Sequence, residues 1–172
     1  MKTETNEQVV HSYSIRSMET SDMPQVMEIY RIGIAAQDAT FETDESLSTW
    51  ENNHFPNSRF VLVNESEQII GWCALLKVHT QAYFQGIAET SIYLLPEFQG
   101  KGLGKILLEK LIIDSEEQGF WTLQAYVFAE NIKSLKLHQK FGFQLVGKRN
   151  KLGKINDSWK DVLLLERRSK KI

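Results

Sequence analysis

A glycine-rich segment near the middle of the chain is the strongest candidate for a ligand-binding site. Gln99-Gly100-Lys101-Gly102-Leu103-Gly104 follows a strand-like run and precedes a run with helical periodicity. Glycine lets the backbone turn tightly and approach a ligand closely. The free N–H groups and the dipole at the start of a helix favour negative charge. We therefore expect this turn to hold a phosphate group.

Two common phosphate-binding motifs do not fit this turn. A P-loop, G-x-x-x-x-G-K-S/T, would need glycine at position 99 and Ser or Thr at position 106, where the chain has Gln99 and Ile106. The dinucleotide pattern G-x-G-x-x-G, started at Gly100, fails at Lys105. The residues alone leave open that the glycines only make a sharp turn between a strand and a helix.

Glu89 and His138 are the candidates for proton transfer. Glu89 lies in a strand-like run among apolar and small residues, which should raise the pKa of its carboxyl and suit it to act as a general base. His138 follows Ser134 by four residues and Asn131 by seven, so the three share one helix face, where an imidazolium could donate a proton. The alternatives are a solvent-facing edge-strand charge for Glu89 and a surface or core histidine for His138. Asn131 is expected to cap its helix.

The composition excludes several classes of protein. Of the 172 residues, 42% are hydrophobic and 24% are charged, and the net charge of −2 does not favour nucleic-acid binding. The one cysteine, Cys73, excludes an internal disulfide and gives no support to a metal site, so we expect it to be a small buried side chain. No run reaches the roughly 18 apolar residues of a membrane span. The polar N-terminus lacks a secretory signal, so the expected location is the cytoplasm.

The hydrophobic pattern predicts one domain whose elements follow the order β-α-α-β-β-β-α-β-α-β-β. A mixed α/β sheet with helices on both faces is the natural arrangement for this order. Tyr93 and Trp159 are expected to be core residues, and the basic cluster at 167–171 is expected to be solvated. The predicted strands cover 13–17, 59–64, 68–77, 87–95, 121–128, 143–147 and 159–165, and the predicted helices cover 20–37, 46–53, 103–118 and 131–141.

Three segments together resemble the GNAT superfamily of N-acetyltransferases. Gln99, Gly102 and Gly104 match its diphosphate-binding signature, R/Q-x-x-G-x-G/A. The run 89–94 stands where the superfamily has its fourth strand, and Asn131, Ser134 and Phe141-Gly142-Phe143 resemble its following helix and strand. The resemblance implies a mixed, mainly antiparallel central sheet flanked by helices on both faces, in a single domain over 13–168. A polar leader at 1–12 and a basic tail at 169–172 would flank it.

The chain further resembles the phosphinothricin acetyltransferase branch, over about 15–165. The resemblance implies transfer of acetyl from acetyl-CoA, as cosubstrate, to the amino group of a small amino-acid-like substrate of the phosphinothricin or methionine sulfoximine type. It also implies a homodimer and no resident metal. The alternatives are another amine acceptor (an antibiotic, a polyamine or a protein N-terminus) or a CoA-binding module without catalysis. The segments that carry the likeness are 29–30, 39–43, 82–83, 89–93, 137–138 and 153–162.

The resemblance also assigns roles to individual residues. Glu89 is implied as the base that takes the amine proton, and His138 as the acid for the departing thiolate. The substrate pocket is expected to include Phe41, Glu42 and Tyr83. The implied acetyl-CoA contacts are Ile92, Tyr93, Leu94, Gln99, Gly100, Lys101, Gly102, Leu103, Gly104, Lys105, Asn131 and Ser134.

Overall fold

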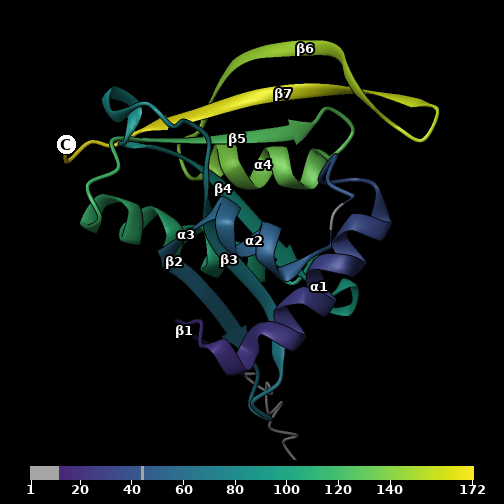
Figure 1. Cartoon of the computed structure of the whole chain (residues 1–172), viewed down its shortest axis with the longest axis vertical. Helices are drawn as coiled ribbons and strands as arrows, with labels where there is room; N and C mark the ends of the chain where they lie inside the picture. The colour runs from purple at the N-terminus through teal and green to yellow at the C-terminus, as the bar shows by residue number, and fades with distance from the viewer. Residues whose placement is uncertain (1–11, 44) are drawn as a thin grey trace, which may run out of the picture.

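The computed structural model describes residues 12–43 and 45–172, which form one seven-stranded sheet with helices on both faces (Figure 1). The strands lie in the order β1-β2-β3-β4-β5-β7-β6, and each neighbouring pair is antiparallel except β4 and β5, which are parallel. The mixed, mainly antiparallel sheet predicted from the sequence is therefore confirmed. The strands are β1 Ser14–Ser17, β2 His54–Val63, β3 Ile69–Lys77, β4 Ile87–Leu94, β5 Thr122–Phe128, β6 Gln144–Ile155 and β7 Ser158–Arg168.

Two helices cover each face of the sheet. Helices α1 (Met23–Ala36) and α2 (Leu47–Asn53) cover one face, and α3 (Leu103–Glu117) and α4 (Ile132–Lys140) cover the other. None of the described helices is long and apolar enough to cross a membrane. The short 3-10 helices are Thr20–Asp22, Ala82–Phe84 and Pro96–Phe98.

The ends of the helices follow local sequence signals. The Asn131 side chain caps α4 by accepting a hydrogen bond of 3.1 Å from the Ser134 backbone N–H, as predicted. The Ser46 side chain caps α2 in the same way, at 3.3 Å from the Thr49 N–H. Helix α1 ends at Ala36, and its C-cap residue Gln37 has a φ of 58°, in the left-handed region.

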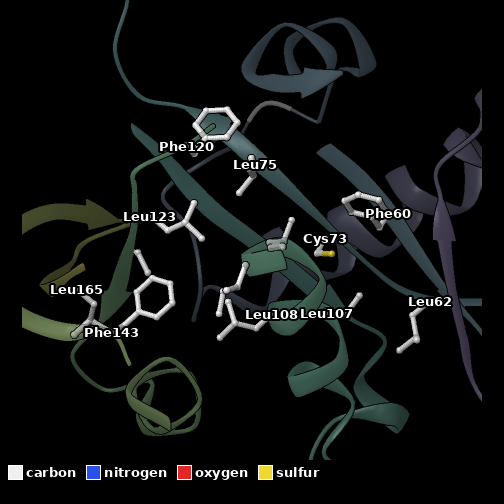
Figure 2. Packing of buried hydrophobic residues seen from close by; sticks show 14 of the residues in the cluster. Phe60, Leu62, Cys73, Leu75, Leu107, Leu108, Phe120, Leu123, Phe143 and Leu165 are labelled. Carbon is white, nitrogen blue, oxygen red and sulfur yellow. The ribbon is translucent and has the colours of Figure 1, made fainter. Parts of the chain in front are cut away.

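Apolar clusters on the two faces hold the helices to the sheet. The larger cluster joins α3 to strands β2 to β5, and Figure 2 shows Leu107 and Leu108 among Phe60, Leu75 and Leu123. The smaller cluster packs α1 and α2 against β2 and β3 through an aromatic group centred on Trp72. Full burial of Cys73 raises the pKa of its thiol well above the usual value, which confirms its assignment as an inert core residue.

Three sequence-based expectations differ from the structure. Strand β2 begins at His54 rather than 59, with an irregular register around Pro56, and β6 and β7 extend well beyond the predicted runs. Trp159 lies on the exposed β6–β7 hairpin with 52% of its surface accessible, so the expectation of a core residue is wrong. The basic C-terminal cluster is also not merely solvated, because Arg167 and Lys171 both pair with the Glu116 carboxylate, at 3.2 and 2.9 Å.

Candidate active site

The site lies where the two parallel strands separate. β4 and β5 pair only from Ile87 to Glu89 on β4 and from Thr122 to Gln124 on β5, and beyond these residues the strands diverge. A cavity of about 1210 Å³ occupies this opening. Its wall includes Glu89 to Leu94 from β4, Ala125 to Phe128 from β5, the glycine turn, and parts of α1, α2 and α4. Divergence of the strands thus places groups from both faces of the sheet around one space.

The glycine turn lies at one end of this cavity. Gly100 and Gly102 have φ values of 75° and 81°, a region that strongly favours glycine, and Gly102 is the N-cap of α3. A Cβ on Gly100 would have no atom of the described residues within 4 Å, so the backbone there is open to a ligand. Gln99 turns back and donates from Nε2 to the Leu94 carbonyl at 3.2 Å, which ties the turn to β4. This arrangement fits a diphosphate bound to the first amides of a 15-residue helix.

Glu89 is a titratable group at the point where β4 and β5 diverge. It is half-buried at the last paired position of β4, opposite Gln124 of β5 and Leu76 of β3. Burial raises the pKa of its carboxyl to about 7, against the opposing effect of hydrogen bonds from the Gln124 side chain and the Tyr126 backbone. A carboxyl with this pKa is part protonated and part ionised at neutral pH, as a general base requires.

His138 stands on the other side of the sheet, where α4 packs. Its Nδ1 lies 2.8 Å from the Ser134 carbonyl oxygen, which can only accept, so Nδ1 carries the proton. Its Nε2 lies 3.1 Å from the Thr90 hydroxyl, which donates to it in the neutral tautomer. Burial lowers the pKa of the imidazole, so the resting form is neutral. An imidazole in this form has no Nε2 proton to give, and it must be protonated before it acts as an acid.

Alternation along β4 places the two candidate groups on opposite faces of the sheet. Glu89 points toward the α1–α2 face, like Tyr93, while Thr90 points toward the α3–α4 face. Both residues line the cavity, which therefore passes between the diverging strands. A molecule in the cavity can contact Glu89 at one side and the Thr90–His138 pair at the other.

The end of the cavity beyond Glu89 is aromatic and acidic. Tyr30, Trp50 and Tyr93 contribute rings, and Glu42 and Asp38 come from the loop between α1 and α2. Burial raises the pKa of Tyr93, with Glu42 and Glu89 among the lesser causes, so its hydroxyl stays protonated. Asn131 fixes the loop, because its Nδ2 donates to the Asp38 carbonyl at 3.2 Å.

Sequence reasoning missed several residues of this acceptor end. Tyr30, Trp50 and His54 all line the cavity. In the sequence, Tyr30 and Trp50 occupy apolar positions of amphipathic helices, and this pattern predicts core residues. Both side chains are indeed at most 7% accessible. Only the divergence of β4 from β5, a long-range feature, opens a space beside them.

Most of the predicted site residues lie on the cavity wall. Three do not line it: Phe41, Tyr83 and Lys101. The Phe41 ring packs edge-on against Phe128 at 4.8 Å and lies against Gly153 of β6, so it anchors the loop instead. Tyr83 is 71% accessible and contacts Phe84. Predicted residues on the wall are Glu42, Glu89, Ile92, Tyr93, Leu94, Gln99, Gly100, Gly102, Leu103, Gly104, Lys105, Asn131, Ser134 and His138.

Comparison with known proteins gives a consistent result. The model of the acetyltransferase (GNAT) family matches residues 24–143. The chain is 27% identical over 158 residues to the L-amino acid N-acyltransferase MnaT of Escherichia coli, covering 89% of this chain and 92% of that protein. A Salmonella typhimurium protein named L-methionine sulfoximine/L-methionine sulfone acetyltransferase is equally similar, at 27% over 158 residues with the same coverage.

A solved structure extends this similarity to three dimensions. It is that of a GNAT superfamily phosphinothricin acetyltransferase from Sinorhizobium meliloti in complex with AcCoA. The two chains superpose with a TM-score of 0.82 at 28% sequence identity, over 91% of this chain and 88% of the other. The similarity thus covers the diverging strands β4 and β5, the glycine turn and the helices on both faces of the sheet.

Proposed function

The chain belongs to the GNAT family of acetyltransferases, and we propose that its acceptor is the amino group of a small amino-acid-like molecule of the methionine sulfoximine or phosphinothricin type. The chain is an acetyltransferase with acetyl-CoA as its cosubstrate. The similarity to relatives named for methionine sulfoximine and phosphinothricin supports the acceptor class, since it extends over about nine-tenths of the chain.

The glycine turn is the proposed site of the CoA diphosphate. The amides from Gly100 to Lys105 lie at the start of α3 and border the cavity, and the space outside Gly100 is open. Asn131 and Ser134, at the start of α4, are the proposed contacts of the arm that joins the diphosphate to the thioester. Acetyl-CoA supplies the activated acetyl group, and backbone N–H groups of β4 around Ile92 and Leu94, freed by the departure of β5, are suited to polarise its carbonyl.

Glu89 is the proposed general base for the acceptor amine. An α-amino group has a reference pKa of about 7.7–8.0, so it is largely protonated at neutral pH and needs to lose a proton before it attacks. The ionised Glu89 carboxylate accepts that proton, directly or through a water molecule. A carboxyl with a pKa of about 7 at the point where the strands diverge is the observation that carries this proposal.

His138 is the proposed source of the proton for the departing thiolate. It acts from the face opposite Glu89, and the Thr90 hydroxyl on its Nε2 also lines the cavity and connects the imidazole to it. The Ser134 carbonyl on Nδ1 fixes the ring and favours its protonated form against the effect of burial. Glu89 would thereby reach the attacking amine from one face of the sheet, and His138 would reach the leaving sulfur from the other.

The experiment that tests this proposal is the Glu89→Gln substitution. The amide keeps the shape of the side chain but cannot take a proton, so kcat should fall about 10²- to 10⁴-fold. Acetyl-CoA affinity, measured by calorimetry, should stay within about threefold, because the diphosphate site is separate. Glu109→Gln, at an exposed position of α3, is the matched control with unchanged kcat. Unaltered turnover of Glu89→Gln would show that Glu89 is not the base.

The same measurements separate the alternatives. A CoA-binding module without catalysis would bind acetyl-CoA in both variants and release no thiol with any amine. An acetyltransferase for a polyamine, an antibiotic or a protein N-terminus would lose turnover in Glu89→Gln only with its own acceptor. The proposed location is the cytoplasm, supported by the single buried thiol, and the proposed assembly is a homodimer, supported by exposed apolar residues on β6 and β7.

A further inference from the structure

A group of lysines surrounds the mouth of the cavity beside the glycine turn. Helix α4 carries Lys133, Lys136 and Lys140, spaced so that they follow one side of the helix, and it contains no acidic residue. Lys105 extends from the first turn of α3. All four side chains are exposed and line the cavity. We call these four residues the lysine rim.

Two members of the lysine rim face one another. Gly104 at the start of α3 approaches Leu137 of α4 so closely that a Cβ on the glycine would lie 3.1 Å from Leu137 Cδ2. This contact brings Lys105 and Lys140 together, and the nearby Lys140 lowers the pKa of Lys105 although Lys105 is exposed. The Lys105 ammonium also lies over the glycine turn, with Nζ 3.9 Å from the position of a Cβ on Gly102.

Among the described residues, no carboxylate forms an ion pair with the lysine rim. Within residues 12–43 and 45–172, the lysines in ion pairs are Lys148, Lys160 and Lys171, and none belongs to the rim. Like charges repel, so this arrangement is destabilising unless an anion binds between them.

The glycine turn and the lysine rim suit different phosphates. Backbone amides at a helix start bind the oxygens of a diphosphate without using a side-chain charge. The remaining phosphate of CoA is the 3′-monoester on its ribose, which carries about −2 at neutral pH. A dianion of this kind needs cationic partners that can adjust to it, and the flexible ammonium groups of lysine provide them.

We propose that Lys105 and Lys140, supported by Lys133 and Lys136, bind the 3′-phosphate of acetyl-CoA and make the enzyme select CoA over 3′-dephospho-CoA. This inference rests on the proposed function, because it names the part of the cosubstrate that the lysine rim contacts. It assigns to the rim a role in specificity and none in the chemical step. The two forms of the cosubstrate share the thioester and the diphosphate, so they isolate the contribution of the monoester.

The test compares kcat/KM for acetyl-CoA and for 3′-dephospho-acetyl-CoA at a saturating amine concentration. The wild type should prefer acetyl-CoA at least about tenfold, as expected for one or two charge-assisted hydrogen bonds. In Lys105→Met/Lys140→Met the preference should fall to about twofold or less, through loss of acetyl-CoA activity while the dephospho form is used as before. Lys110→Met, on the same helix but outside the rim, is the control and should keep the wild-type preference.

Two kinetic results would overturn the role of the lysine rim in binding the 3′-phosphate. An equal loss with both cosubstrates in the double variant would overturn the inference, because it would show that the lysines contact the diphosphate. A wild type that uses both cosubstrates equally well would also overturn it. If acetyl-CoA itself supports no transfer and does not bind, the proposed function fails as well, so the two failures are distinguishable. Thermal unfolding of each variant shows whether the fold is retained, as expected for exposed lysines.

Discussion

Among single residues, Glu89 and His138 owe their protonation states to their surroundings. The same kind of burial acts in opposite directions on the two groups, since it penalises the charged form of each. It raises the pKa of Glu89 to about 7, so this carboxyl is part ionised at neutral pH, and it lowers the pKa of His138, so the resting imidazole is neutral. A strand carboxylate and a helix histidine are visible in the sequence, but their pKa shifts come from neighbours distant along the chain.

The pH dependence of the reaction follows from the sign of the Glu89 shift. Its raised pKa means that the carboxyl is protonated, and unable to accept a proton, below about pH 7. We expect kcat/KM to increase about tenfold per pH unit below this value and to level off above it. The measurement is a pH profile from 5.5 to 9 with two acceptor amines of different basicity. A limb that moves with the pKa of the amine would belong to the substrate and not to Glu89.

At the scale of elements, the sequence predicts the order of the fold well. All four helices and all seven strands occur where periodicity places them, within a few residues at most ends. The exceptions have physical causes. β2 starts early across Pro56, which interrupts its pairing, and the polar second part of β6, residues 148–155, forms a strand because its partner β7 supplies the hydrogen bonds. Tertiary pairing of this kind leaves no local signal.

The site is predictable only in part for a similar reason. The glycine turn, Glu89 and the α4 residues are recognisable because each belongs to a short local motif. The acceptor end is not, because it arises from the divergence of β4 and β5, which brings Trp50 and His54 to the cavity. Phe41 and Tyr83, which the resemblance implies for the substrate pocket, do not line the cavity, because Phe41 packs against Phe128 and Tyr83 is exposed.

Two glycines of the turn allow the effect of a positive φ to be distinguished from the effect of steric crowding. Gly102 has a φ of 81°, so Gly102→Ala forces alanine into the left-handed region, at a cost of about 1–2 kcal/mol. Because the turn should relax to avoid this cost, we expect the KM for acetyl-CoA to rise about tenfold. Gly104 has no positive φ, and Gly104→Ala needs only a small shift of Leu137, so its KM should change by less than about threefold. Steady-state kinetics on both variants makes the comparison. Equal effects would mean that the turn does not depend on the left-handed glycine.

At the scale of the whole molecule, the exposed surface of the β6–β7 hairpin is the unusual feature. Leu145, Val146 and Trp159 are each more than half accessible, and β6 is an edge strand of the sheet. Figure 1 shows this hairpin extending past the other strands. Exposed apolar groups on an edge strand favour association, so the hairpin is the expected contact of the proposed homodimer.

Light scattering after size exclusion tests the assembly. The wild type should have twice the chain mass, and Val146→Glu should shift it toward the monomer by placing a charge in the contact. Ile113→Glu, at an exposed apolar position on α3, should leave the mass unchanged. A monomeric wild type, or a dimer equally insensitive to both substitutions, would exclude this contact.

The most direct test of the whole account is the release of free thiol from acetyl-CoA in the presence of L-methionine sulfoximine. We expect one thiol per N-acetylated product, with a rate that saturates in both substrates. We expect no release when the amine is already acetylated, because the acceptor is then blocked. Thiol release that does not depend on a free amine, or no release with L-methionine sulfoximine or phosphinothricin, would contradict it.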